Sequence, residues 1–117
     1  MNLPIIKHED NRRILTEWIS NTPVKRCKVI ETKVKCTLGK HYHNKCDSFF
    51  YMLKGKTQYS LLEPNTKKVL KRDWLFEGEG ISVSKGIVHV FNMFPNTIML
   101  EAATEPYDKE DEIQITE

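Results

Sequence analysis

Two histidines separated by one residue, His41 and His43, carry the most promising chemistry in this chain. Successive side chains of a β-strand point to opposite faces, so these two imidazoles would share one face if the segment is a strand. A pair of imidazoles can bind a metal ion, or transfer protons near neutral pH. A third histidine, His89, follows much later in the chain. The elements around these residues decide whether the three can meet.

The sequence around the histidines is typical of short β-strands. Residues 27–38 alternate in polarity, which predicts one strand that ends at Gly39 and turns its even-numbered residues, Val34 among them, inward. The apolar run at residues 49–53 predicts a buried strand that a turn at Gly55 closes. About eight to ten such strands, separated by turn residues, predict an all-β sandwich or barrel.

A tyrosine could act as the acid that partners a histidine base. Tyr51 lies in the apolar run and shares strand parity with His41 and His43 if the strand is continuous, so it is the first candidate. Tyr59, in the predicted return arm of the hairpin, is the second candidate and could also contact a substrate. A histidine and a tyrosine together could move a proton to and from a substrate.

The composition excludes several classes of protein. The 117 residues and the formal net charge of +2 fit one globular domain with interspersed charges. There is no basic block of the kind that nucleic-acid-binding proteins carry, and no apolar run of the roughly 20 residues that a membrane helix needs. Three cysteines without a Cys-x-x-Cys pair indicate a reduced, cytoplasmic setting. We expect residues 1–9 to form an extended arm and residues 105–117 an acidic surface tail.

The first histidine pair and its glycines resemble a motif of the cupin superfamily of small jelly-roll barrels. His41-x-His43 and Gly55 match the first cupin motif, and Gly39 lies closer to the pair than the motif asks. The resemblance implies an all-β fold, a small single-domain cupin jelly-roll barrel over residues 1–117.

A second stretch resembles the second cupin motif. Gly78, Gly86 and His89 fall at its spacing. Ser84 stands where the motif has proline, and Asn92 comes one residue early. Together the two motifs cover about half of the chain, and they are more specific for the fold than for the function.

In metal cupins, the motif histidines and a glutamate hold one divalent metal. Carried over by position, the resemblance implies that His41, His43 and His89 bind Zn, Fe, Mn or Ni. The glutamate is missing, since counting forward from His43 gives Asp47 and counting back from the closing glycine gives Ser48. Asp47 could replace it, because a carboxylate oxygen is a suitable ligand.

Both ends of the chain are similar to cupins that act on nucleotide sugars. Residues 10–17 resemble the opening of RmlC-like nucleotide-sugar epimerases, and residues 103–113 resemble the tail of cupin 3,4-ketoisomerases that act on thymidine-diphosphate keto sugars. This resemblance implies a homodimer that needs no cofactor, with His41 or His43 as general base. Arg12 and Arg13 would bind the diphosphate, and His89 would contact the substrate.

The leading hypothesis is therefore a cupin isomerase or epimerase that acts on a nucleotide-linked keto sugar in surface polysaccharide synthesis. A metal-dependent cupin enzyme with three histidine ligands, of the dioxygenase or phosphosugar isomerase type, is the second. A non-catalytic cupin that binds a sugar or another effector is the third. In each case we expect a small-molecule partner, and neither nucleic acid nor a membrane.

Overall fold

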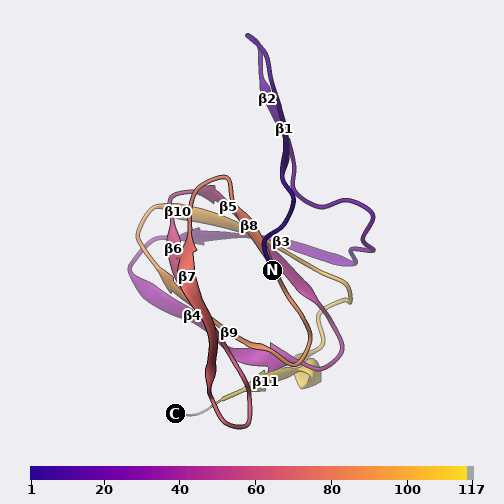
Figure 1. The fold of residues 1–117 in the computed structure, drawn as a ribbon, viewed down its shortest axis with the longest axis vertical. Coiled ribbons are helices and arrows are strands. Elements are labelled where there is room, and N and C mark those ends of the chain that lie inside the picture. The colour runs from indigo at the N-terminus through magenta and orange to yellow at the C-terminus, as the bar shows by residue number, and fades with distance from the viewer. Residues whose placement is uncertain (116–117) are drawn as a thin grey trace.

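Eleven short strands and one turn of 3₁₀ helix make up the regular structure of residues 1–115, the part of the chain that the computed structural model describes (Figure 1). None of these elements is a helix long and apolar enough to cross a membrane. In chain order they are β1 (Ile6–Glu9), β2 (Ile14–Glu17), β3 (Arg26–Thr32), β4 (Cys36–His43), β5 (Ser48–Lys54), β6 (Thr57–Leu62), β7 (Val69–Leu75), β8 (Gly80–Val83), β9 (Val88–Met93), β10 (Thr97–Ala103), η1 (Lys109–Asp111) and β11 (Glu112–Gln114).

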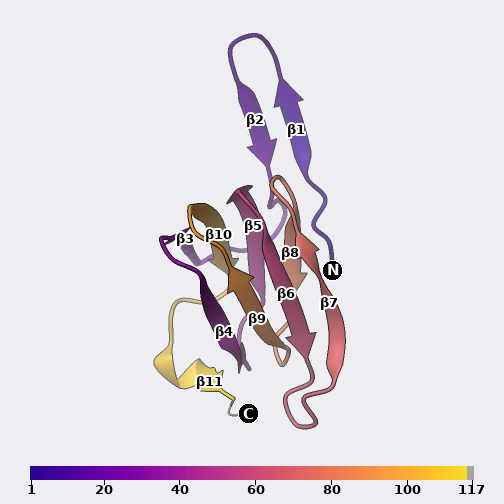
Figure 2. The ribbon, with the colours of Figure 1, turned by 90° about the vertical axis from the view of Figure 1, so that its left-hand side faces the viewer.

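Two antiparallel sheets form the body of the molecule. One has four strands in the order β3-β10-β5-β8, and the other has five in the order β11-β4-β9-β6-β7. Figure 2 shows the five-stranded sheet in front of the other. The crossing order of the strands is that of a jelly roll, so the predicted all-β jelly-roll fold is confirmed.

The hydrophobic core lies between the two sheets and follows the alternation of the strands. Phe50 and Met52 of β5 face Tyr59 and Leu61 of β6, and each of these side chains is less than 9% exposed. Alternating apolar residues are what a strand with one buried face requires. Six further residues complete this cluster: Leu75, Ile81, Val83, Phe91, Met93 and Met99.

The predicted strand over residues 27–38 is interrupted in the structure. β3 ends at Thr32, β4 begins at Cys36, and the chain between them turns. Val34 lies in that turn and is 66% exposed, so its predicted inward orientation is wrong. Polarity alternates across the turn by chance, and periodicity alone cannot detect such a break.

Gly39 does not end a strand but forms a bulge inside β4. Gly39 pairs with Val90 and His41 pairs with His89, so Lys40 is an extra residue in the ladder. Gly39 has a φ of +94°, and a Cβ atom at this position would collide with the carbonyl oxygen of His89. The extra residue reverses the alternation of β4, because one added residue moves the following side chains to the other face.

The N-terminal segment forms a hairpin that stands away from the sheets. β1 pairs with β2, and Asp10 closes the turn between them by accepting hydrogen bonds from the backbone N–H groups of Arg12 and Arg13. Figures 1 and 2 show this hairpin extending from the end of the molecule opposite β11. The predicted arm at residues 1–9 thus contains β1, and its first residues run beside β8 through a bridge between Asn2 and Ile81.

The acidic C-terminal segment is built into the five-stranded sheet. β11 pairs with β4, and Asp111 is only 6% exposed. The prediction of a surface tail at residues 105–117 is therefore wrong for residues 111–113, and residues 116–117 lie outside the described part of the chain. Strand pairing brings these acidic residues beside the histidines of β4.

The bulge predicts a stability difference between two glycines. Gly39→Ala should lower the free energy of unfolding by about 3 kcal/mol or more, because it adds a backbone collision to the cost of a positive φ. Gly78→Ala is the matched control, since Gly78 has a φ of +85° and nothing within 4 Å of the added Cβ. It should cost only about 1 kcal/mol. Urea unfolding measures both, and equal losses would contradict the role of the bulge.

Candidate functional site

Two neighbouring strands of the five-stranded sheet bring three histidines together. β4 supplies His41 and His43, and β9 supplies His89, which is the direct register partner of His41. The ring centroids are 4.6 Å apart for His41 and His89, and 5.1 Å apart for His41 and His43. The two imidazoles of β4 lie on one face, as strand parity predicts. We call these three residues the histidine cluster.

Two members of the histidine cluster border a cavity of about 260 Å³ between the two sheets. His41 and His89 lie on the wall formed by the five-stranded sheet, and Lys28 and Glu101 lie on the opposite wall. Between them the lining is largely apolar. It consists of Ile30, Leu38, Gly39, Phe50, Phe91 and Met99.

Sequence reasoning did not single out Lys28 or Glu101. The signal was present, because Glu101 is the one charged residue in the apolar strand β10. Its side chain is 11% exposed, and its oxygens lie 3.5 Å from Lys28 Nζ and 3.9 Å from Arg26 Nη2. Glu101 thus contacts two cations, of which Lys28 lines the cavity and Arg26 does not.

Burial keeps two imidazoles of the histidine cluster uncharged. Burial, with smaller contributions from His41 and His43, lowers the pKa of His89 to about 3. Burial also lowers the pKa of His41, and the charge of Glu112 opposes this shift in part. Both side chains are therefore neutral near pH 7, the form that accepts a proton or binds a metal ion.

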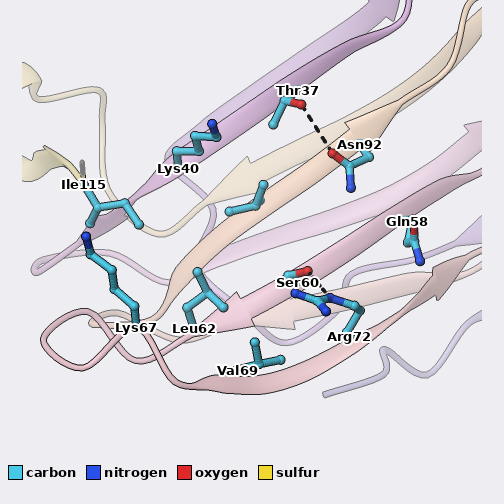
Figure 3. Close-up of a pocket in the computed structure, with 11 residues that line it drawn as sticks. Thr37, Lys40, Gln58, Ser60, Leu62, Lys67, Val69, Arg72, Asn92 and Ile115 are labelled. Carbon is cyan, nitrogen blue, oxygen red and sulfur yellow. Dashed lines mark hydrogen bonds between the residues drawn. The ribbon is translucent and has the colours of Figure 1, made fainter. Parts of the chain in front are cut away.

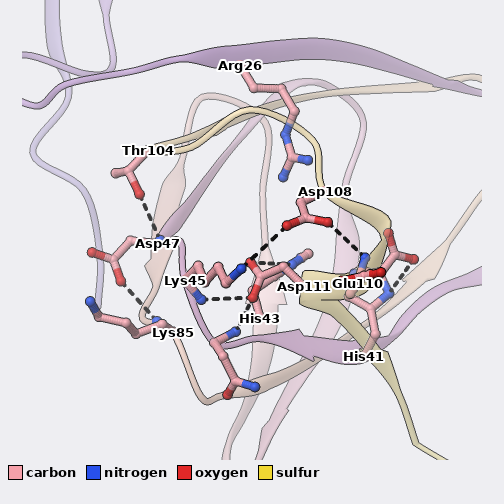
Figure 4. A network of polar contacts seen from close by, with 12 residues as sticks. Arg26, His41, His43, Lys45, Asp47, Lys85, Thr104, Asp108, Glu110 and Asp111 are labelled. Atoms are coloured by element: carbon pink, nitrogen blue, oxygen red, sulfur yellow. Dashed lines mark hydrogen bonds and ion pairs between the residues drawn. The ribbon is translucent and has the colours of Figure 1, made fainter.

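Two carboxylates of the C-terminal segment lie behind the histidine cluster. Glu112 Oε1 is 3.6 Å from Nδ1 of His41, and Asp111 Oδ2 is 3.7 Å from Nδ1 of His43. Asp111 also accepts hydrogen bonds of 2.8 and 2.9 Å from the backbone N–H groups of Asn44 and Lys45 (Figure 4). Sequence reasoning missed both roles, although the resemblance of residues 103–113 to a ketoisomerase tail pointed to this segment.

A hydrogen bond of 3.1 Å joins His41 Nε2 and His89 Nε2, so one of these two rings donates and the other accepts. The contact of 3.6 Å between Glu112 Oε1 and Nδ1 of His41 is electrostatic, since it is longer than a hydrogen bond.

Asp47 does not lie with the histidine cluster, which corrects its prediction as a metal ligand. Its carboxylate accepts a 2.9 Å hydrogen bond from the backbone N–H of Lys85, and its own N–H donates to the hydroxyl of Thr104 (Figure 4). The chain turns after His43, so residue counting no longer predicts the direction of the side chain. Asp47 instead joins three loops.

The two candidate tyrosines also lie away from the cavity. Tyr51 belongs to β5 in the other sheet and stacks on Trp18 at 5.7 Å, on the face opposite Phe50. The predicted continuous strand does not exist, so the parity argument for Tyr51 is wrong. Tyr59 is 2% exposed in the hydrophobic core, where its ring lies 6.4 Å from that of Phe91.

Arg12 and Arg13 lie at the tip of the β1–β2 hairpin. Arg12 forms an exposed ion pair with Asp10 at 3.0 Å. The hairpin points away from the end of the molecule where β11 flanks the histidine cluster (Figures 1 and 2). Within one chain these arginines therefore do not reach the cavity.

The donor set of the histidine cluster fits a metal ion. His41, His43 and His89 each offer a nitrogen, and these atoms lie within 4.8 Å of one another. A second group among the described residues, His43, Cys46 and Asp111, meets the same distance. Burial and Asp111 raise the pKa of the Cys46 thiol, which disfavours the thiolate that binds metals. The histidine cluster is thus the better candidate.

Comparisons with known proteins place this architecture. No family model matches the sequence. An uncharacterized protein of Aquifex aeolicus is 31% identical over 83 residues, which are 70% of this chain. The match spans 63% of the length of that relative, less than two thirds.

Solved structures match over almost the whole chain. A 3,4-ketoisomerase from Helicobacter canadensis has a TM-score of 0.86 at 21% identity, covering 98% of this chain and 90% of its own. A mutant of the 3,4-ketoisomerase QdtA from Thermoanaerobacterium thermosaccharolyticum, in complex with TDP-4-keto-6-deoxyglucose, has a TM-score of 0.82 at 19% identity, with 98% and 86% covered. The rmlC epimerase of Mycobacterium tuberculosis has a TM-score of 0.82 at 15% identity, with 97% and 67% covered. The topology and these likenesses together establish that the chain has the RmlC-like cupin jelly-roll fold.

Proposed function

We propose that this protein is an isomerase or epimerase that acts on a nucleotide-linked keto sugar in surface polysaccharide synthesis. The observation that carries the proposal is a pair of neutral imidazoles, His41 and His89, that face Lys28 and Glu101 across a cavity. The fold supports it, because solved proteins of this architecture include one bound to TDP-4-keto-6-deoxyglucose.

The chemistry needs a base, an electrophile and a returning proton. The base removes the proton from the carbon next to the carbonyl group. The electron pair of that C–H bond forms a C=C bond, and the π electrons of the carbonyl group move onto its oxygen to give an enediolate. In an epimerase a proton then returns to the opposite face of the same carbon. In an isomerase a proton adds to the former carbonyl carbon and another to its oxygen, while the hydroxyl group on the neighbouring carbon loses its proton and becomes the new carbonyl group. No oxidant or reductant is consumed, because electrons only move within the sugar.

His41 is the base that the geometry favours. It lines the cavity, whereas His43 does not. Glu112, 3.6 Å from its Nδ1, would stabilise the imidazolium that forms when Nε2 takes the proton. In the free protein His89 contacts this same nitrogen at 3.1 Å, so the substrate would have to displace that contact for Nε2 to take the proton. Lys28, held by Glu101, supplies positive charge on the other wall for the enediolate oxygen.

A variant of the base tests this function. His41→Asn should slow proton abstraction by about 100- to 10,000-fold, because an amide cannot accept the proton. TDP-4-keto-6-deoxyglucose incubated with protein in D₂O, followed by NMR, reports deuterium entering the sugar ring. Lys33→Asn is the control, because Lys33 is an exposed residue of the turn between β3 and β4, outside the hairpin and the cavity. Exchange at the normal rate in His41→Asn would refute His41 as base. A wild-type protein that binds keto sugars without exchange would instead be the sugar- or effector-binding cupin.

We also propose a homodimer built through the N-terminal hairpin. A two-stranded hairpin is marginally stable alone in water, yet this one exposes Ile6, Ile14 and Leu15 by 47% to 55%. The nearby outer face of the four-stranded sheet exposes Val29 and Leu53. A second copy would cover both surfaces. The substrate-binding role predicted for the hairpin arginines requires such a copy.

Sedimentation equilibrium tests the dimer. The wild-type chain should show twice the monomer mass. Leu15→Glu should lower the measured mass toward that of the monomer, because it places a charge in the surface that the dimer would bury. Val34→Glu is the matched control, since Val34 is equally apolar and 66% exposed but lies outside the hairpin. A wild-type protein that stays monomeric at about 100 μM would exclude the dimer, because a dimer with a Kd in the micromolar range would form at that concentration.

A metal-dependent cupin is the second candidate, favoured by the three converging nitrogens of the histidine cluster. A bound divalent ion would polarise a substrate carbonyl as a Lewis acid. For the isomerase we expect the exchange rate to be unchanged after treatment with a chelator. Elemental analysis is the deciding measurement. Close to one equivalent of Zn, Fe, Mn or Ni in the wild type, and none in the His41→Ala, His43→Ala variant, would favour the metal enzyme. In that case adding metal to chelator-treated protein should restore the activity of the wild type but not of the variant.

A further inference from the structure

The isomerisation of a keto sugar moves two protons, and the histidine cluster accounts for one of them. His41 can carry the proton that leaves one carbon and is added to the next. The second proton leaves the hydroxyl group on the neighbouring carbon, and the former carbonyl oxygen gains one, so its carrier must reach both oxygens of the substrate. An epimerase needs no such carrier. Because His41 occupies one wall of the cavity, a carrier of the second proton belongs on another wall.

An ion pair occupies the wall opposite the histidines. Lys28 and Glu101 both line the cavity, and they are register partners on the neighbouring strands β3 and β10, so their side chains lie next to each other on one face. On its other side Glu101 pairs in register with Phe50 of β5, whose ring centroid lies 5.4 Å from that of His89. The carboxylate is therefore one side chain away from the histidine cluster.

The carboxylate of Glu101 keeps hydrogen-bonding positions for a ligand. Its side chain is 11% exposed, and Lys28 Nζ and Arg26 Nη2 lie 3.5 and 3.9 Å from its oxygens. Both distances exceed about 3.2 Å, the upper end of the usual range for an N–H···O hydrogen bond. The two cations thus attract the carboxylate without occupying its lone pairs. A buried ion pair adds little stability compared with apolar residues of similar volume, so stability alone does not explain a charge in this apolar strand.

A larger hollow elsewhere on the molecule lacks these groups. Its volume is about 620 Å³, and Gln58, Ser60 and Leu62 of β6 line it on the outer face of the five-stranded sheet, since the alternate residues of that strand face the core (Figure 3). None of the described residues that line it is a histidine, an aspartate or a glutamate. It therefore offers no base for either proton, whereas the smaller cavity combines a histidine with an ammonium–carboxylate pair.

We propose that the Lys28–Glu101 pair is an acid–base relay for the hydroxyl proton, which makes Glu101 a catalytic residue and the reaction an isomerisation rather than an epimerisation. This inference rests on the proposed function of the cavity. A relay needs one group that gives a proton and one that takes a proton, within reach of each other and of two neighbouring oxygens. An ammonium and a carboxylate group 3.5 Å apart on one wall meet that requirement.

The relay balances over one turnover. After His41 has taken the carbon-bound proton, the Lys28 ammonium group donates a proton to the enediolate oxygen and becomes an amine. The Glu101 carboxylate takes the proton of the neighbouring hydroxyl group, and the electron pair of that O–H bond becomes the π bond of the new carbonyl group. The electrons of the C=C bond take the proton of the His41 imidazolium. The proton on Glu101 then passes to the amine of Lys28, so all three groups return to their starting states.

Two variants separate the relay from the carbon step. Glu101→Gln removes the carboxylate base with little change of shape, and Lys28→Arg keeps a positive charge for the enediolate oxygen but cannot release its proton. With TDP-4-keto-6-deoxyglucose in D₂O, both should still exchange deuterium, near the wild-type rate, into the carbon that bears the neighbouring hydroxyl group. Both should form the isomerised keto sugar about 100-fold more slowly or worse, measured by NMR in the same sample.

A second ion pair supplies the matched controls. Lys25 and Glu105 are 3.2 Å apart, more than 40% exposed, and outside the cavity. Glu105→Gln and Lys25→Arg should therefore leave both exchange and conversion unchanged. Lys28→Arg also keeps the test valid if Glu101→Gln fails to fold, because the Lys28 side chain is 51% exposed.

The other outcomes would overturn the relay in distinguishable ways. Conversion at the wild-type rate in either cavity variant would show that another group carries the hydroxyl proton, with the isomerase itself intact. Equal losses of exchange and of conversion in Lys28→Arg would assign the pair to binding or to the carbon step. A wild-type protein that exchanges deuterium but only inverts the carbon would be an epimerase without a relay. A wild-type protein without exchange would overturn the proposed function, and the relay with it.

Discussion

The close approach of β4 to β9 at Gly39 controls both faces of the five-stranded sheet. A side chain at this position would collide with the carbonyl oxygen of His89, so the two backbones can meet only at a glycine. The bulge that follows reverses the alternation of β4. As a result Leu38 and His41 both face the cavity, and Lys40 faces the opposite side of the sheet. One irregularity of the backbone thus sets the positions of a histidine that lines the cavity and of a lysine on the outer face.

Burial is tolerated at His41 and His89 because both imidazoles stay uncharged near pH 7. Burying three charged imidazoles together would combine desolvation with mutual repulsion, and the low pKa of His89 expresses both effects. Glu112 opposes the shift at His41 alone, since it lies beside that ring. The cluster therefore contains rings of unequal basicity, which is the condition for one to take a proton while another remains a neutral donor.

The sequence predicted the parts of the site that depend on local spacing. His41 and His43 share a face because the period of a strand is fixed, and motif spacing added the third histidine. Tyr51 failed because parity does not survive the turn between β4 and β5. Asp111 was placed on the surface because its partner strand is some 70 residues away in sequence, and the pairing of distant strands leaves no local trace. The all-β fold itself was predictable from alternation and turn residues, whereas the bulge was not.

The shortest strand closes the site. β11 has three residues and lies at an edge of its sheet, where it pairs with β4 alone. An edge strand held by so few backbone hydrogen bonds detaches at a small fraction of the free energy of global unfolding. Its departure would carry Glu112 away from His41 and hydrate the histidine cluster, with the sheets still folded. The basicity of the site is therefore tied to a local opening equilibrium, and a ligand that contacts β11 would hold the strand in place and retune the imidazoles as it binds.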